Sequence, residues 1–408
     1  MKHFGIKLSL FLIYFVFAAL LNSVGILVER SQAVYDVAKE AAAILEPFKD
    51  LSIALVSFFI GSFLPKIGYK RGMLVSLALV FLGCISMYFA DSFMAVKILF
   101  AITGMTFAVV KVAVYALVGY VSDTKNDHSK LLSLIETVFM IGIIFMYVVF
   151  PLFYDDSPDG WLRGYLLMAV LIAVAFLIIL FSKFDIEGDK KDTSVVGDFI
   201  EMFKLFKSPL TWIFALFAFF YVMTEQGIMT WLPTFNKETL GIDARLASQV
   251  AVLLMISFAL GRFITGLLVK KIRWVYIAIA GVILASIIVL TVLPLAKGIT
   301  TSGVSSFADL PMVAFLFPLI GLFLAPLYPL VSSAVLSSMP KRDHSSLAGV
   351  LTFFSAVGGT VGSLIIGFMF DSFGGDKVFY LSLIPMTAIF ILLFSLNKLT
   401  GSPSDEIV

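Results

Sequence analysis

Long apolar runs recur along the whole chain, and they constrain its fold more than any other feature. The 408 residues are 60% hydrophobic and only 14% charged, which is more apolar surface than a water-soluble domain can bury. Each run is long enough to cross the hydrocarbon core of a bilayer as a helix. We therefore predict an all-α membrane protein with twelve transmembrane helices. In chain order the expected spans are residues 8–28, 38–65, 73–90, 94–121, 130–153, 162–182, 209–235, 245–269, 274–294, 312–339, 345–370 and 378–397.

Basic residues are unevenly divided between the two sets of connecting loops. With both termini on the cytoplasmic side, the inner loops hold 18 Lys and Arg residues and the outer side holds about eight. Positive residues concentrate in cytoplasmic loops. We therefore expect a multi-pass protein of the bacterial inner (cytoplasmic) membrane, with both termini in the cytoplasm and lipid around it.

A polar connection over residues 182–208 is the longest between any two spans, and it predicts two halves of six spans each. We expect an N-terminal bundle over residues 1–181, a cytoplasmic central loop and a C-terminal bundle over residues 209–408. The halves share sequence, because Asp127-His128-Ser129 opens the fifth span and Asp343-His344-Ser345 opens the eleventh.

A second repeat aligns the fourth span with the tenth. Phe100-x-x-x-Gly104-x-x-x-Ala108 recurs as Phe317-x-x-x-Gly321-x-x-x-Ala325. Two parallel six-span halves are typical of transporters that bind substrate at the interface between the repeats and rock around it. In this alignment Tyr328 is the counterpart of Lys111, so we expect both side chains to face one cavity.

Lys111 lies near the middle of the fourth span. Its nearest charged neighbours along the chain, Lys97 and Asp123, are each about 18–21 Å away at roughly 1.5 Å per residue. An isolated charge at the bilayer centre costs at least about 2.5–3.5 kcal/mol, so Lys111 should face a cavity or a partner. The alternative to an anion-binding role is a permanent ion pair with Asp50 or Glu46.

The connection between the second and third spans carries a recognisable motif, Gly61-Ser-Phe-Leu-Pro-Lys66-Ile-Gly68-Tyr69-Lys70-Arg71. It resembles the loop signature of the major facilitator superfamily, Gly-x-Leu-x-Asp-Arg-x-Gly-Arg-Arg/Lys, with Pro65 at the usual acidic position. A second copy, Gly266-Leu-Leu-Val-Lys270-Lys271, follows the eighth span. Together with the twelve spans and the repeat, this resemblance covers essentially the whole chain and implies a transporter of two six-helix bundles.

Within that superfamily the chain looks most like the fucose–galactose–hexose proton symporters. The likeness is carried by Gly68-Tyr69-Lys70, Gly261-Arg262-Phe263 and Tyr328-Pro329. That family has an aspartate in the first span where this chain has Gly25, and a glutamate in the fourth span where it has Lys111. One acid is therefore missing and the other is reversed in charge, which argues against neutral-sugar symport by that family's arrangement.

The second span carries Glu46, Lys49 and Asp50 at i, i+3 and i+4, which places them on one face of a helix. We expect this charged stripe to line the cavity. The alternative is that the span begins at Leu51 and the stripe belongs to an outer loop.

Other polar residues complete the expected site and gate. Glu136 has the alternative role of an inner-gate salt-bridge partner, and Arg30 that of an outer headgroup contact. Arg262 is expected to be a structural cation that ties the eighth span to the neighbouring inner loop. The substrate-binding or coupling candidates are Lys111, Glu46, Lys49, Asp50, Glu136, Glu225, Gln226, Tyr328, Arg30 and Asn22. The gate or loop-motif candidates are Gly61, Lys66, Gly68, Lys70, Arg71, Arg262, Gly266 and Lys270.

These residues predict a secondary active transporter of a small polar, anionic solute, such as a sugar acid or sugar-like compound, coupled to protons. Lys111 would receive the carboxylate, and Glu46, Asp50, Glu136 or Glu225 would carry the proton. The alternatives are a neutral sugar symporter, an exporter of drugs or metabolites and, least favoured, a transporter-like nutrient sensor. No catalytic constellation accompanies the charges, so we expect no enzyme, cofactor, metal site or nucleic-acid partner, and a monomer in the bilayer.

Overall fold

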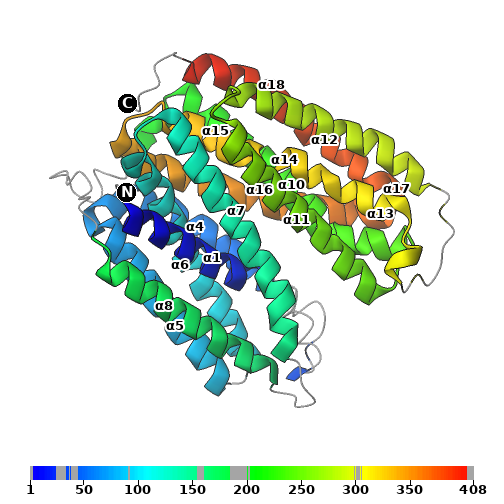
Figure 1. Ribbon diagram of the computed structural model, residues 1–408, viewed down its shortest axis with the longest axis horizontal. Coiled ribbons are helices and arrows are strands. Elements are labelled where there is room, and N and C mark those ends of the chain that lie inside the picture. The colour runs from blue at the N-terminus through cyan, green and yellow to red at the C-terminus, as the bar shows by residue number, and fades with distance from the viewer. Residues whose placement is uncertain are drawn as a thin grey trace.

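The computed structural model describes residues 3–23, 34–35, 37, 45–90, 92–153, 160–183, 200, 203–297, 299, 304 and 306–401 (Figure 1). Within these residues twelve helical segments are long and apolar enough to cross a membrane, which confirms the number of spans. The protein is therefore a multi-pass integral membrane protein.

The first six spans come from the N-terminal part of the chain. They are α1 (Phe4–Leu21), α4 (Leu45–Ile67), α5 (Tyr69–Ala90), α6 (Phe93–Val121), α7 (Lys125–Val149) and α8 (Arg163–Phe181). The last six follow residue 208. They are α10 (Pro209–Glu238), α11 (Ala244–Leu268), α12 (Trp274–Ala296), the group from α13 (Met312–Leu316) through α14 (Ile320–Leu324) to α15 (Leu327–Leu336), α16 (His344–Phe373), and α17 (Gly375–Val378) with α18 (Leu383–Thr400).

Several helix bounds differ from the expected spans by a few residues, and two of the differences have clear local causes. The fifth span begins at Lys125 rather than residue 130, because the Thr124 side chain accepts a hydrogen bond from the backbone N–H of Asp127 and caps the helix. The tenth span is broken into short pieces, with Pro318 in a 3₁₀ turn and Pro326 just before α15. Proline has no N–H to donate and its ring crowds the preceding turn.

The two groups of six helices pack against each other at the end that carries both termini (Figure 1). Two helix pairs make most of this contact, α4 with α16 and α7 with α11. In the repeat these pairs are equivalent, since each joins a second-position helix of one half to a fifth-position helix of the other. The halves are therefore joined around an approximate two-fold axis.

Glycines allow α4 and α16 to cross in close contact. A Cβ atom added at Gly61 would lie 3.0 Å from the carbonyl oxygen of Ser345, and one added at Gly349 would lie 2.6 Å from that of Ser57. Small residues let membrane helices approach backbone to backbone, where van der Waals packing stabilises the contact.

The duplicated Asp-His-Ser motifs also meet at this end. His128 Nδ1 lies 2.7 Å from Ser333 Oγ, and Ser129 Oγ lies 2.6 Å from the same atom. The rings of His128 and His344 stand edge to face with their centroids 6.2 Å apart. Because α7 and α15 belong to different halves, these buried polar contacts hold the halves together.

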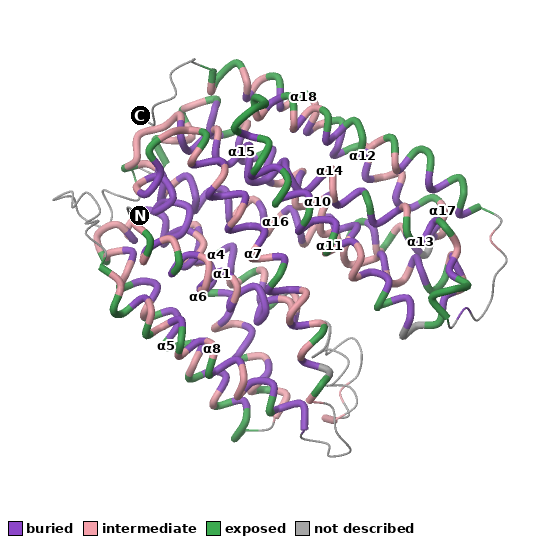
Figure 2. The backbone as a smooth tube through the Cα atoms, in the orientation of Figure 1, coloured by how far each residue is buried: buried purple, intermediate pink, exposed green. Residues whose placement is uncertain are grey.

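The outer faces of the helices are apolar. Figure 2 shows buried residues concentrated between the helices and exposed residues along their outer sides. Phe89, Phe181 and Phe368 are each more than 70% exposed. A water-soluble protein rarely leaves so many large apolar side chains uncovered, whereas lipid solvates them.

Ser333→Ala tests the contact between the halves. The substitution removes both hydrogen bonds to Ser333 and leaves buried partners unsatisfied, at a cost of about 1–3 kcal/mol. We expect a larger population in which this end is open, seen as longer distances between spin labels at the exposed positions Asn126 and Lys271. Ser332→Ala is the matched control, since Ser332 is equally buried and its hydroxyl has no partner among the described residues. Equal shifts in both variants would show that the contact does not hold this end closed.

Candidate functional site

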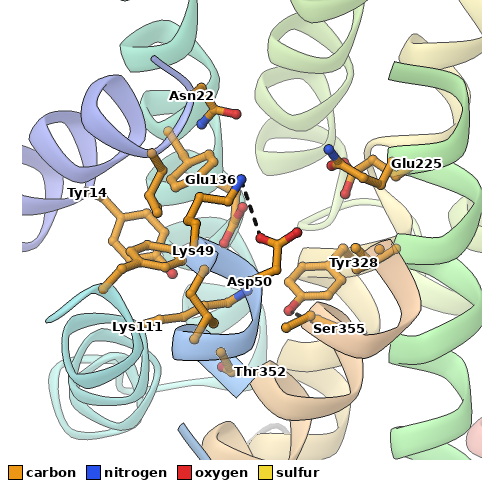
Figure 3. A pocket seen from close by; sticks show the side chains of 18 of the residues that line it. Tyr14, Asn22, Lys49, Asp50, Lys111, Glu136, Glu225, Tyr328, Thr352 and Ser355 are labelled. Atoms are coloured by element: carbon orange, nitrogen blue, oxygen red, sulfur yellow. Dashed lines mark hydrogen bonds and ion pairs between the residues drawn. The ribbon is translucent and has the colours of Figure 1, made fainter. Parts of the chain in front are cut away.

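A cavity of about 150 Å³ lies between the two halves, at the centre of the helix bundle (Figure 3). Residues from both halves line it, on helices α1, α4, α6, α7, α10, α11, α15 and α16. Its walls carry six charged side chains, which are Lys49, Asp50, Lys111, Glu136, Glu225 and Arg262.

Arg262 on α11 joins two carboxylates from different halves. Its Nη1 atom lies 3.1 Å from Glu136 Oε2 on α7, and its Nη2 atom lies 2.8 Å from Glu225 Oε1 on α10. The Arg262 side chain is 2% exposed. A buried guanidinium requires such partners, because desolvating it alone costs several kcal/mol.

Two tyrosine hydroxyls extend this cluster. Tyr115 donates to Glu136 Oε1 at 2.7 Å, and Tyr221 donates to Glu225 Oε1 at 3.1 Å. Each tyrosine lies four residues from a charged residue of the site on its own helix, Tyr115 from Lys111 and Tyr221 from Glu225. Side chains four residues apart share one helical face.

Lys111 lies among aromatic rings. Its Nζ atom lies 4.9 Å from the ring centroid of Tyr328, 5.8 Å from that of Phe107 and 5.9 Å from that of Tyr115. Ring faces attract a cation, with about 0.5–2 kcal/mol per contact. Among the described residues no carboxylate lies within the 4.0 Å of an ion pair with Lys111.

The contacts around Lys111 form a closed network of side chains. Tyr328 packs against Tyr221 with centroids 5.3 Å apart, and Tyr221 donates to Glu225. On the other side the ring of Tyr115 faces Lys111 and its hydroxyl donates to Glu136. Arg262 joins the two carboxylates and closes this network. A negative charge bound at Lys111 would therefore act on Arg262 and on both carboxylates.

The second span brings its charged stripe to the cavity as part of a helix. Lys49 Nζ pairs with Asp50 Oδ1 at 3.4 Å, and both residues line the cavity (Figure 3). Glu46, one turn earlier, accepts a hydrogen bond from Gln226 Nε2 at 3.4 Å. The alternative ion pair of Lys111 with Asp50 or Glu46 is absent from these described residues.

Arg262 is placed differently from the sequence expectation. It lies in the cavity wall with Glu136 and Glu225, and it has no inner-loop partner in the part of the chain that the structure describes. The carboxylates determine this position, since both lie at the depth of the guanidinium and a buried cation is most stable between them. Glu136 accordingly belongs to the cavity cluster.

The remaining binding candidates lie at the edge of this cluster. Asn22 lines the cavity at the end of α1 and donates to the carbonyl of Ala18 at 2.9 Å. Gln226 lines it from α10, beside Glu225. Arg30 lies outside the described residues.

Apart from Arg262, the gate and loop candidates lie at the end where the halves meet. Gly68 has a φ of 92°, a left-handed conformation that favours glycine, and it separates α4 from α5. Lys70 Nζ donates to the carbonyls of Leu180 and Ser182, and so caps α8 within the first half.

Lys270 pairs across the halves with an acid at this end. Lys270 Nζ lies 3.7 Å from Asp127 Oδ1, with both side chains about half exposed. Exposed pairs of this kind contribute little stability. Gly266 faces Leu134 of α7 at ordinary contact distance, Lys66 lies in the last turn of α4, and Arg71 is exposed.

Sequence reasoning missed several polar residues of the cavity. Tyr14, Thr352 and Ser355 line it, and Ser355 Oγ lies 2.9 Å from the Tyr328 hydroxyl. The repeat could have identified Thr352, because it lies eight residues after His344, as Glu136 lies eight after His128. No comparable signal marks Tyr14.

Two six-helix halves around a charged central cavity define a class, the membrane transporters that alternate access to a central site. The sequence profile described as the Major Facilitator Superfamily matches residues 10–306. The chain belongs to this superfamily, whose members are transporters and not enzymes.

Curated relatives match about half of the chain. It is 26% identical over 195 residues to Bypass of stop codon protein 6 from Saccharomyces cerevisiae, covering 48% of this chain and 38% of that protein. It is 25% identical over 227 residues to the multidrug transporter protein MdtP from Bacillus subtilis, covering 54% and 37%. The chain thus spans less than half the length of these two relatives.

Solved structures share the whole fold. The transporter FucP, in the outward conformation, superposes with a TM-score of 0.78 at 16% identity, over 98% of this chain and 100% of FucP. The proton:xylose symporter XylE, bound to 6-bromo-6-deoxy-D-glucose, gives a TM-score of 0.78 at 12% identity, over 100% and 97%.

Arg262→Met should destabilise the protein strongly. The substitution leaves Glu136 and Glu225 close together without their cation, and breaking a buried ion pair in this way costs about 3–5 kcal/mol. The free energy of unfolding in mixed detergent micelles measures the loss. Arg273→Met is the control, because Arg273 is exposed and surface changes cost about 0.5 kcal/mol or less. Similar losses in both variants would show that the cluster adds no stability.

Proposed function

We propose that this chain is a secondary active transporter that moves a small anionic solute, of the sugar-acid or sugar-like class, together with protons by alternating access. The observation that carries the proposal is Lys111. Arg262 and Lys49 have carboxylate partners in the cavity, whereas Lys111 meets only aromatic rings among the described residues. A cation inside a membrane protein needs a negative partner, and a carboxylate of the solute would supply it.

Cavity size and lining favour a small polar solute. Pockets for drug-sized ligands have volumes of about 300–1,000 Å³, and this cavity has about 150 Å³. The hydroxyls of Tyr328, Ser355 and Thr352 can exchange hydrogen bonds with a hydroxyl-rich solute. FucP and XylE, whose fold this chain shares, are described as sugar:proton symporters.

Two alternatives remain as candidate functions. Export of a drug or metabolite is favoured by the likeness to MdtP, whose name describes a multidrug transporter. Neutral-sugar symport is favoured by the structural neighbours. Both predict transport that does not need the charge of Lys111, so one residue distinguishes them from the anion proposal.

Sidedness follows from the basic loops. If these loops face the cytoplasm, the end where the halves meet is cytoplasmic and both termini lie there. The cavity in this conformation would then be reached from the outer side. This arrangement suits the first step of uptake, in which solute and proton enter from outside.

Lys111→Met tests the anion proposal. Loss of a buried charge partner costs about 2 kcal/mol or more, so we expect uptake to fall at least about thirty-fold, while Lys111→Arg retains part of it. A panel of radiolabelled sugars and sugar acids in proteoliposomes, with and without a proton gradient, identifies the solute. Calorimetry then compares its affinity for wild type and variants across mildly acidic and neutral pH.

The exposed Lys398→Met serves as the matched control and should transport normally. Lys111→Glu restores the acid of the hexose symporters but should not restore hexose uptake, because Gly25 still lacks the second acid. Equal solute affinity of wild type and Lys111→Met at every pH would refute the anion proposal.

A further inference from the structure

The two carboxylates that share Arg262 are bonded differently. Glu136 uses both oxygens, since Oε1 accepts from Tyr115 and Oε2 accepts from Arg262. Glu225 uses one oxygen for both of its donors, since Oε1 accepts from Arg262 and from Tyr221. Among the described residues no donor reaches Glu225 Oε2. A proton added to either oxygen of Glu136 would point at the donor that already occupies it, Tyr115 or Arg262. A proton added to Glu225 Oε2 would meet no donor among the described residues.

Glu225 is also the more accessible of the two. Its side chain is 12% exposed, compared with 6% for Glu136. Figure 3 shows it extending from α10 toward the other side chains that line the cavity. Water in the cavity can therefore exchange a proton with Glu225 without disturbing the contact of Arg262 with Glu136.

The six charged side chains that line the cavity have no net charge before any solute binds. Lys111 and Arg262 are opposed by Glu136 and Glu225, and Lys49 is opposed by Asp50. A monoanionic solute on Lys111 adds one negative charge. Moving a net charge through a closed, low-dielectric cavity is costly, and a single proton on the cluster removes that charge.

We propose that Glu225 takes the coupling proton at Oε2, and that one proton enters with each negative charge of the solute, so that the loaded carrier moves no net charge. The proton leaves water on the open side, forms an O–H bond on Glu225 and returns to water on the other side. The stoichiometry rests on the proposed anionic solute, whereas the proton site rests on the cluster alone.

The groups around Glu225 support this assignment. Arg262 of α11 holds Oε1, Tyr221 of α10 donates to it, and Tyr328 of α15 packs on that tyrosine. Glu136 of α7 and Lys111 of α6 act on it through space, and the cavity-lining part of α16 carries only Thr352, Ser355, Ala356 and Gly359.

Asp50 and Glu46 are weaker candidates for the proton. Asp50 pairs with Lys49, its neighbour on α4. Protonation of Asp50 would therefore change an ion pair within one helix and not the ion pairs of Arg262 in the second half. Glu46 lies outside the cavity lining and contacts Gln226 at 3.4 Å. Among the described residues, Arg262 joins one protonatable carboxylate from each half through ion pairs of 2.8 and 3.1 Å, whereas the other pair across the halves, Lys270 with Asp127, is half exposed at 3.7 Å.

Infrared difference spectroscopy of the purified protein tests the proton site without any solute. On mild acidification we expect wild type to gain one C=O band of a buried carboxylic acid. Glu225→Gln should lack this band, while Glu136→Gln and Glu238→Gln should keep it. Glu238 is the matched control, an exposed glutamate on the same helix. A band that persists in Glu225→Gln and disappears in Glu136→Gln would overturn the assignment.

Proteoliposome transport of D-gluconate tests the stoichiometry. With the membrane potential clamped, wild type should take up one proton per gluconate at a rate independent of the potential. Glu225→Gln should still exchange gluconate across the membrane but lose at least tenfold of its proton-driven accumulation. Gluconate uptake that carries current, or that proceeds without protons, would overturn the one-to-one coupling. If wild type ignores gluconate but transports neutral sugars, the anionic solute is refuted, and the infrared result still decides the proton site.

Discussion

The rest of the structure depends on the burial of Arg262. A guanidinium that is 2% exposed must keep carboxylates beside it, and it takes one from each half of the protein. This requirement holds α7 against α11 and orients Tyr115 and Tyr221 through the acids that they contact. The ring of Tyr115 then lies 5.9 Å from Lys111 Nζ, and that of Tyr221 packs on Tyr328. A single desolvated cation thereby connects the packing of the halves to the chemistry of the cavity.

The equivalent interface on the other side of the axis uses different forces. Where α7 and α11 carry Glu136 and Arg262, the repeat places Thr352 and Ser57 on α16 and α4. There the helices meet through Gly61 and Gly349 at backbone contact distance. Van der Waals packing tolerates small sliding movements, whereas an ion pair must be broken or carried along. The two interfaces should therefore respond differently to protonation, although their geometry is similar.

Sequence alone predicted the fold class because a bilayer accepts few solutions. Apolar runs of sufficient length must be helices, and the repeat correctly brought Tyr328 to Lys111. The partners of Arg262 could not be predicted in this way. The sequence indicates how deep a residue lies in the membrane, but it does not show that Arg262 contacts Glu136, which is 126 residues away along the chain. The pairing of Lys49 with Asp50 was missed for a related reason, since one helical face can satisfy its charges internally or across the cavity.

The meeting of the two Asp-His-Ser motifs has a consequence for the history of the chain. A motif copied by duplication is normally free to drift in one copy while the other keeps the original role. Here the ring of His128 stands against the ring of His344, and a side chain at Gly119 would collide with His344. Each copy is part of the other's environment, so a change in one alters the selection on its twin. The two halves can diverge in the cavity, but at this point they must coevolve.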